Sequence, residues 1–305
     1  MTARPAISVV IPHLNDAERL GRCLAALAAQ DADMTRAEII VVDNGSREPP
    51  AGLVAGFRGA RLVGERTPGP GPARNRGAAL AAAPILAFTD SDCIPEPGWV
   101  AAILARFAAE PATGIIGGDV RVFAADPGRP TPAEAYDLIY AFRQRTHIAR
   151  RRFSVTANLA VRREVFAAVG PFGGLEVSED LDWGQRAAAL GHATRFAPEM
   201  VVRHPARRDM AALRAQWDRH TSHFYATRAA TARGRLKWAL TIPVMAASPL
   251  AEIPRILASD KVAGPRARWQ VFRGLAGLRL HRARRMLEAL QGGRARTASR
   301  EWNRG

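Results

Sequence analysis

The chain has 305 residues, of which 48% are hydrophobic, and this is enough for one large α/β domain or two ordinary ones. It has only two cysteines, Cys23 and Cys93, which excludes a disulfide framework and is typical of a reducing compartment. The N-terminal segment lacks the apolar core of a signal peptide, so we expect a cytoplasmic protein.

The formal net charge of +16 belongs entirely to the C-terminal third of the chain. Residues 203–305 hold 22 of the 44 lysines and arginines but 6 of the 28 acidic residues, whereas residues 1–202 are neutral. The charge excess therefore concerns what the C-terminal region contacts rather than the chemistry of the first two thirds.

The first two thirds alternate between apolar strands and helices. Short apolar runs predict strands over 7–11, 39–42, 61–64, 85–89, 158–161 and 200–202. Asn15 and Glu18 form a predicted capping box at the start of the first helix. Further helices are predicted over 73–83, 99–109, 132–145, 163–169 and 180–190, and the pattern is helical from 209 onward. This alternation favours an α/β fold with a mostly parallel sheet and helices on both faces, whose ligands bind beyond the carboxyl ends of the strands.

Two carboxylates, Asp90 and Asp92, follow the apolar run 85–89 at the end of a predicted strand. Oxygen ligands at this spacing suit Mg²⁺ or Mn²⁺, which bind one or two carboxylates together with the phosphates of a substrate. An ordinary acidic turn is the alternative interpretation of such a pair when it stands alone.

Six motifs in order resemble the family-2 glycosyltransferases, which have the Rossmann-like GT-A fold. They are Ser8–Pro12, Val41–Ser46, Gly71–Gly77, Thr89–Asp92, Ala157–Asn158, and Glu179–Trp183 with Arg186. The resemblance covers residues 6–205. It implies a catalytic domain over 1–205 that transfers a sugar from a nucleotide-sugar to an acceptor hydroxyl with inversion, followed by a helical, basic region over 206–305.

The resemblance also implies how the donor is held. Asp43 would accept a hydrogen bond from the nucleotide base, and the segment ending at Pro12 would form a wall beside that base. Arg74 opens a helix after a Gly/Pro loop, which is a natural site for a diphosphate. The alternatives are that Asp43 only caps a turn and that Arg74 is a solvated charge.

The metal site would use Asp92, which binds the cation that holds the diphosphate, while Asp90 contacts the sugar or ribose. A histidine after the last strand completes the metal site in some branches of the fold, and His204 occupies that position. An imidazole suits Mn²⁺ better than Mg²⁺. The alternative is that His204 belongs to a basic patch with Arg203 and Arg207.

The resemblance assigns the general base to Asp180, which would take the proton of the acceptor hydroxyl. We expect the helix N-terminus to keep this carboxylate ionised. Glu179 is the alternative base, or a partner that orients the acceptor, and the cluster as a whole would also serve as a helix cap. Asp182 is expected to lie farther from the reaction, and Trp183 either stacks on an acceptor sugar or fills the core.

The basic C-terminal third predicts contact with a membrane surface. The uncharged stretch 238–251 is shorter than the roughly 20 residues that a spanning helix needs. The segment 266–290 reads as an Arg-rich amphipathic helix, which favours peripheral binding to the anionic inner face of the cell membrane. The alternative is a solvated helical cap on the catalytic domain, and we expect no nucleic-acid partner.

These features predict an inverting glycosyltransferase that acts in cell-surface, exopolysaccharide or lipid-linked glycan synthesis. Its partners would be a nucleotide-sugar donor, Mn²⁺ or Mg²⁺, and a glycan or lipid-linked acceptor. A nucleotidyltransferase of similar fold would need a Gly-rich loop after the first strand, where 12–16 reads Pro-His-Leu-Asn-Asp. An inactive membrane-associated scaffold is disfavoured because Asp90, Asp92 and Asp180 are all present.

Overall fold

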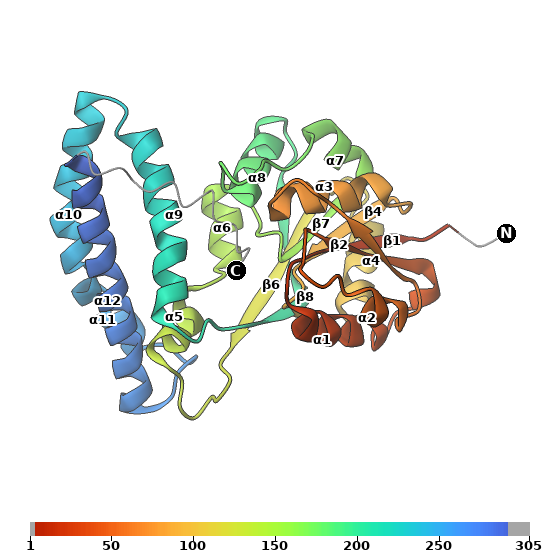
Figure 1. Cartoon of the computed structure of the whole chain (residues 1–305), viewed down its shortest axis with the longest axis horizontal. Helices are drawn as coiled ribbons and strands as arrows, with labels where there is room; N and C mark the ends of the chain where they lie inside the picture. The colour runs from red at the N-terminus through yellow and green to blue at the C-terminus, as the bar shows by residue number, and fades with distance from the viewer. Residues whose placement is uncertain (1–3, 292–305) are drawn as a thin grey trace. The chain divides into compact units, whose positions relative to one another are not determined.

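The computed structural model describes residues 4–291, which form two compact units (Figure 1). The first unit runs to Arg121 and resumes over Phe142–His204, and the second comprises Val122–Ala141 and the chain from Pro205 onward. The segment Val122–Ala141, which the sequence analysis included in 1–205, thus groups with the helical unit. The predicted basic region 206–305 extends beyond Gln291, and its residues 292–305 lie outside the described part of the chain.

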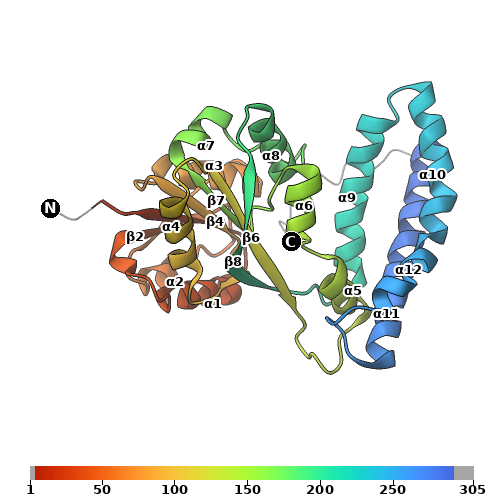
Figure 2. The same cartoon turned by 180° about the vertical axis from the view of Figure 1, so that it is seen from behind.

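One eight-stranded mixed sheet, in the order β3-β2-β1-β4-β7-β6-β8-β5, forms the centre of the fold (Figures 1 and 2). Its strands are β1 (Ile7–His13), β2 (Ala37–Asp43), β3 (Ala60–Gly64), β4 (Ile85–Thr89), β5 (Ile94–Pro95), β6 (Ile115–Phe123), β7 (Asn158–Arg162) and β8 (Thr194–Pro205). The half from β3 to β4 is parallel, as expected. Beyond it, β7 runs antiparallel to both β4 and β6, and β5 antiparallel to β8, so the sheet is more mixed than the sequence pattern indicated.

Helices cover both faces of this sheet in the first unit. They are α1 (Ala17–Ala28), the 3₁₀ turn η1 (Met34–Arg36), α2 (Ala51–Ala55), α3 (Pro70–Leu80), α4 (Trp99–Ala109), α6 (Gln144–Arg151), α7 (Arg163–Val169) and α8 (Glu179–Ala189). Side chains of β1 alternate between two cores: Val9 packs with α1 and α4, whereas Val10 packs with α3, α7 and α8. Figure 1 shows α3, α7 and α8 on one side of the sheet and α1 and α2 on the other.

The start of α1 differs from the predicted capping box by one residue. Asp16 is the N-cap, and its carboxylate accepts from the backbone N–H of Arg19. Asn15 instead adopts a left-handed conformation with φ 52°, and its side-chain oxygen accepts from the N–H of Arg47. Asn15 therefore ties the turn after β1 to the turn after β2, next to the carboxyl ends of both strands.

Asn158, at the start of β7, joins three elements through one buried amide. Its Nδ2 donates to the carbonyls of Asp119 in β6 (2.7 Å) and Met200 in β8 (2.9 Å), and its Oδ1 accepts from Trp99 in α4 (2.8 Å). A Cβ on Gly118 would lie 2.3 Å from this Nδ2, so β6 needs glycine there. The Ala-Asn motif therefore has an architectural role at this point of the sheet.

The second unit is a helical bundle. Its helices are α5 (Pro132–Tyr140), α9 (Met210–Arg228), α10 (Ala232–Ala251), α11 (Ile253–Leu257) and α12 (Gly264–Leu290). A Cβ on Gly274 would lie 2.3 Å from the carbonyl of Pro132, so this glycine lets α12 approach α5 closely. The apolar residues of α12 lie mostly on one face, as expected, but this face is only partly covered: Leu275 and Met286 are buried within the unit, whereas Trp269 and Leu287 are exposed.

The segment Ala232–Leu257 is long and apolar enough to cross a membrane by length and composition, and only 11% of its apolar window is buried. The sequence had suggested a shorter stretch, because Pro243 and Pro249 interrupt it, yet α10 continues through both prolines. One such helix is weak evidence for spanning, and the same exposure suits a helix that lies on a surface.

Candidate active site

The carboxyl ends of β1, β2 and β4 bring the first group of predicted site residues to one edge of the sheet. His13 is paired in register with Asp43, and Pro12 with Val42, so the ends of β1 and β2 lie side by side. β4 lies on the other side of β1 and leads directly into Asp90. This is the edge at which α/β sheets bind ligands.

Asp43 and His13 hold buried polar atoms that lack a partner. The Oδ2 of Asp43 accepts from the N–H of Ser46 (3.2 Å), while its Oδ1 has no hydrogen-bond partner among residues 4–291. Neither ring nitrogen of His13 has one within the same range, and burial lowers the pKa of this imidazole, which keeps it neutral at pH 7. Leaving such groups unpaired costs about 1–3 kcal/mol each, so this corner of the site suits a polar ligand.

His13 was not among the residues that the sequence analysis selected. It directly follows the predicted wall residue Pro12, and that position was the only signal that could have found it. Asp43 can both cap the turn and bind a ligand, since Oδ2 accepts from the N–H of Ser46 while Oδ1 has no partner among the described residues.

Arg74 is a buried cation between two carboxylates. Its Nη2 lies 2.6 Å from Oδ1 of Asp90, and its Nη1 lies 2.9 Å from Oε1 of Glu179. The side chain is 4% exposed, which excludes the solvated-charge alternative. The contact with a diphosphate stays a prediction, because the two terminal nitrogens of the guanidinium already engage carboxylates.

Asp92, in the loop after β4, and His204, near the end of β8, lie together. β5 pairs with the end of β8, with Ile94 opposite Arg203, and this pairing brings His204 to the loop after β4. His204 Nε2 is 3.4 Å from Oδ1 of Asp92, and with Cys93 these residues offer three ligand atoms within 4.8 Å of one another.

Of these three possible metal ligands, two suit a hard divalent cation. Burial raises the pKa of Cys93 well above its usual range, so its sulfur stays a protonated thiol and a poor ligand for a hard cation. Burial is also the main reason why the pKa of Asp92 is raised, against the opposing effect of His204. A divalent cation would compensate the half-buried Asp92 carboxylate, so Asp92 and His204 fit a divalent cation as a pair.

Asp180 and Glu179 begin α8, directly after its N-cap Ser178. Burial, reinforced by the neighbouring charge of Glu179, raises the pKa of Asp180 to about 7. The helix N-terminus alone would keep this carboxylate ionised, as predicted from the sequence, but loss of solvation outweighs that effect. A pKa near 7 suits a group that accepts a proton at neutral pH.

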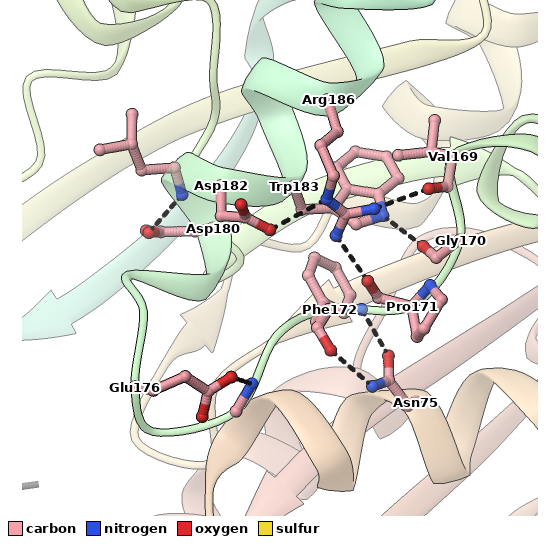
Figure 3. Close-up of polar contacts among 12 residues, drawn as sticks. Asn75, Val169, Gly170, Pro171, Phe172, Glu176, Asp180, Asp182, Trp183 and Arg186 are labelled. Carbon is pink, nitrogen blue, oxygen red and sulfur yellow. Dashed lines mark hydrogen bonds and ion pairs between the residues drawn. The ribbon is translucent and has the colours of Figure 1, made fainter.

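The rest of the acidic motif supports α8. Trp183 is 1% exposed and donates from Nε1 to the carbonyl of Gly170 (2.9 Å), so it fills the core rather than stacking on an acceptor. Arg186 donates to the carbonyls of Val169 and Pro171 and pairs with Asp182 at 2.9 Å (Figure 3). Asp182 therefore has a structural partner, which agrees with its expected distance from the reaction.

The loop after α7 connects α8 to α3. Asn75 of α3 donates to the carbonyl of Phe172 and accepts from its N–H, both at 2.9 Å (Figure 3). A Cβ on Gly71 would lie 2.0 Å from the carbonyl of Gly173, so the helix that carries Arg74 packs directly on this loop. The Gly71–Gly77 motif thus fixes the distance between α3 and the loop.

A glycosyltransferase fold with these acidic residues at its sheet edge agrees with the comparisons to known proteins. The model of the family described as "Glycosyl transferase family 2" matches residues 8–170, and the chain belongs to this family. Glycosyltransferase AglE of Haloferax volcanii is 34% identical over 211 residues, 67% of this chain and 68% of AglE.

Two further similarities are more limited. Validoxylamine A glucosyltransferase of Streptomyces hygroscopicus subsp. jinggangensis is 34% identical over 147 residues, 45% of this chain and 33% of that enzyme. Mannosyltransferase PcManGT from Pyrobaculum calidifontis, solved in complex with GDP-Man and Mn²⁺, superposes with a TM-score of 0.63 at 20% identity. This superposition covers 95% of this chain and 88% of the mannosyltransferase, and it shows the shared GT-A fold.

The ion pairs of Arg74 predict a large loss of stability in Arg74→Met. Removing one partner from a buried ion pair costs about 3–5 kcal/mol, and we expect a loss at the lower end of this range because Asp90 and Glu179 are 29% and 22% exposed. Urea unfolding measures the loss.

Arg76→Met is the matched control, because Arg76 is an exposed arginine on the same helix. Its free energy of unfolding should stay within about 0.5 kcal/mol of that of the unchanged protein. Equal losses in the two variants would show that the ion pairs of Arg74 contribute no particular stability.

Proposed function

We propose that this protein is a metal-dependent, inverting glycosyltransferase that moves a sugar from a nucleotide-diphosphate-sugar to an acceptor hydroxyl. One observation carries the proposal: the Arg74 guanidinium links Asp90, at the end of β4, to Glu179, beside the carboxyl group of Asp180. A group suited to donor binding and a group suited to accepting a proton are thereby held in one rigid constellation.

The donor base would lie against Asp43 and His13. The free Oδ1 of Asp43 can accept the ring N–H of uracil or guanine, whereas cytosine and adenine present a ring nitrogen that is itself an acceptor. The neutral imidazole of His13 offers one donor and one acceptor to the same base. This arrangement would pair buried atoms that the protein alone leaves unpaired.

The diphosphate of the donor would lie beside Asp92 and His204. A divalent cation bound there supplies electrostatic stabilisation to the departing nucleoside diphosphate. Asp92 supplies the hard oxygen ligand and His204 the imidazole, which together favour Mn²⁺. Asp90, held by Arg74, is then available to the sugar or ribose of the donor.

Asp180 would act as the general base. Its carboxylate accepts the proton of the acceptor hydroxyl while that oxygen bonds to the anomeric carbon and the bond to the donor diphosphate breaks. A single displacement of this kind inverts the anomeric centre. The raised pKa of Asp180 supports this role, since a stronger base at neutral pH takes a hydroxyl proton more readily.

We further propose that the acceptor is a cell-surface or lipid-linked glycan and that the second unit contacts the anionic inner face of the cell membrane. Support comes from the exposed apolar row of α10, in which Leu236, Leu240 and Val244 are 62%, 64% and 66% exposed. Arg233, Arg235 and Lys237 adjoin this row at the N-terminal end of the helix. Apolar residues flanked by cations are typical of a helix at a membrane interface.

Nucleoside diphosphates should stabilise the protein selectively. In the presence of Mn²⁺, UDP or GDP should raise the Tm more than CDP or ADP, because only uracil and guanine offer Asp43 a ring N–H, whereas cytosine and adenine present a ring acceptor there. Asp43→Asn and Asp92→Ala should each lose the shift, the first through the base and the second through the metal. Differential scanning fluorimetry measures all four nucleotides in one series.

The donor-site assignment would be wrong if the shift were independent of Mn²⁺ and of the base. The matched control is Asp182→Asn, because Asp182 has a structural partner on α8 and should leave the nucleotide response unchanged.

Asp180→Asn should lower acceptor-dependent turnover by about 10²–10⁴-fold while nucleoside diphosphate binding survives, because the substitution removes a proton acceptor and keeps the side chain's shape. In the unchanged protein the rate should rise with pH through about 7, as Asp180 loses its proton. Initial rates from pH 5.5 to 8.5 measure both effects. A near-normal rate for Asp180→Asn with an inactive Glu179→Gln would reverse the assignment within the pair.

Membrane binding should depend on the exposed row of α10. Leu240→Gln with Val244→Gln should reduce co-sedimentation with phosphatidylglycerol vesicles several-fold, because two exposed apolar side chains no longer enter the interface. Added salt should weaken binding of the unchanged protein, which distinguishes a surface contact from a spanning helix. Leu190→Gln, at a 57% exposed leucine of the first unit, is the control. Equal sedimentation of all three proteins would contradict the proposal.

A further inference from the structure

An open surface pocket of about 390 Å³, called the cavity below, lies in the first unit between the end of α6 and the second half of α8. Six residues line it, and three of them are consecutive arginines: Arg150, Arg151, Arg152, Gln185, Ala188 and Ala189. Its volume lies within the range of small-molecule sites. None of these residues belongs to the metal or nucleotide part of the site described above.

The charged residues that line this cavity are all arginines. Residues 138–163 contain seven arginines and no acidic residue, although residues 1–202 as a whole are neutral. Arg150, Arg151 and Arg152 are all exposed, and none forms a salt bridge with a described carboxylate. The guanidinium of Arg151 lies over the ring of Phe153, at 5.2 Å from its centroid, which leaves its charge without an anionic partner among the described residues. Three unneutralised guanidinium groups therefore surround one opening.

Stabilising the C-terminus of α6 does not account for all three arginines. A cation near a helix C-terminus is favourable by about 0.3–1 kcal/mol, and one side chain suffices for that effect. Arg152 also occupies the helix C-cap in the left-handed conformation, with φ 59°. Glycine or asparagine is preferred at such a position, and another residue there costs about 1–2 kcal/mol. A ligand for the guanidinium groups would explain why arginine is present.

The cavity shares α8 with the proposed base. Gln185, Ala188 and Ala189 follow Asp180 by five to nine residues, or roughly 7–14 Å at 1.5 Å per residue. Gly184 fixes the spacing, because a Cβ at this position would lie 2.4 Å from the Cβ of Phe153. The donor residues Asp43 and Asp92 come from other elements, at the ends of β2 and β4.

We propose that this cavity binds a phosphate or diphosphate group carried by the acceptor. The term acceptor rests on the function proposed above, whereas the anion site rests on the cavity and its arginines. Guanidinium groups bind phosphate oxygens through paired, charge-assisted hydrogen bonds, and the amide of Gln185 adds a neutral donor. The separation from Asp180 leaves room for the part of the acceptor that joins its phosphate to the attacking hydroxyl.

Binding of inorganic pyrophosphate in excess EDTA tests this site, because EDTA removes the divalent cation on which the donor site depends. Isothermal titration should detect binding to the unchanged protein, and R150Q/R152Q should weaken it about 10-fold or more, as expected for lost charge-assisted hydrogen bonds. R22Q/R58Q removes two exposed arginines elsewhere in the first unit and should bind pyrophosphate like the unchanged protein. Circular dichroism confirms that the variants are folded.

Two results would overturn the proposal. The first is no pyrophosphate binding by the unchanged protein in EDTA, and the second is equal weakening in R22Q/R58Q, which would indicate only an effect of net charge. A third measurement separates the sources of phosphate: if R150Q/R152Q loses binding to phosphatidylglycerol vesicles but keeps pyrophosphate binding, the arginines serve a lipid surface and the cavity assignment is wrong.

Nucleoside diphosphate binding with Mn²⁺ separates this inference from the proposed function. R150Q/R152Q should leave the UDP or GDP response unchanged, since these arginines lie outside the donor site. If the unchanged protein binds pyrophosphate in EDTA but no nucleoside diphosphate with Mn²⁺, the anion site is supported and the proposed glycosyltransfer is contradicted. If it binds nucleoside diphosphate with Mn²⁺ but no pyrophosphate in EDTA, the donor site is supported and the acceptor-phosphate site is contradicted.

Discussion

The buried guanidinium of Arg74 is the interaction on which the site depends. It pairs with Asp90 at the end of β4 and with Glu179 at the start of α8, and a buried cation of this kind is tolerated only while both partners stay in place. Neither element can shift without exposing or orphaning a charge. Arg74 thereby neutralises two carboxylates and leaves Asp180, which has no ion pair among residues 4–291, as the group whose pKa burial raises to about 7.

The two ends of α8 have different roles, because residues one or two turns apart face different neighbours. Its first turn presents Glu179 and Asp180, while Trp183 and Arg186, one and two turns further on, bind the carbonyls of the loop after α7. That loop is also joined to α3 through Asn75, so the two helices that carry Arg74 and its partner Glu179 share one support. The acidic motif thus combines two carboxylates in the first turn of α8 with later side chains that anchor the helix to the loop.

The sequence predicted best what depends on local patterns. The strand 85–89 and the helices 99–109 and 163–169 have the predicted bounds, because each is an apolar run with clear ends. β6 was missed because two adjacent glycines, Gly117 and Gly118, interrupt its apolar pattern, and the need for them is apparent only from the close approach of Ser154 and Asn158. In the site, the carboxylates were identifiable by their positions at strand and helix ends. The partners of Arg74 were not, since they lie 16 and 105 residues away along the chain.

The net charge of residues 1–202 also shows how little a summed property says about the distribution of charges in the fold. The neutrality of residues 1–202 suggested that basic contacts belong to the C-terminal third alone, but this sum conceals a segregation within the first unit. Acidic residues gather at the carboxyl edge of the sheet, where Asp43, Asp90 and Asp92 lie, while residues 138–163 contain only positive charges. The neutral sum therefore hides two oppositely charged regions, so the first unit can attract cations at one place and anions at another.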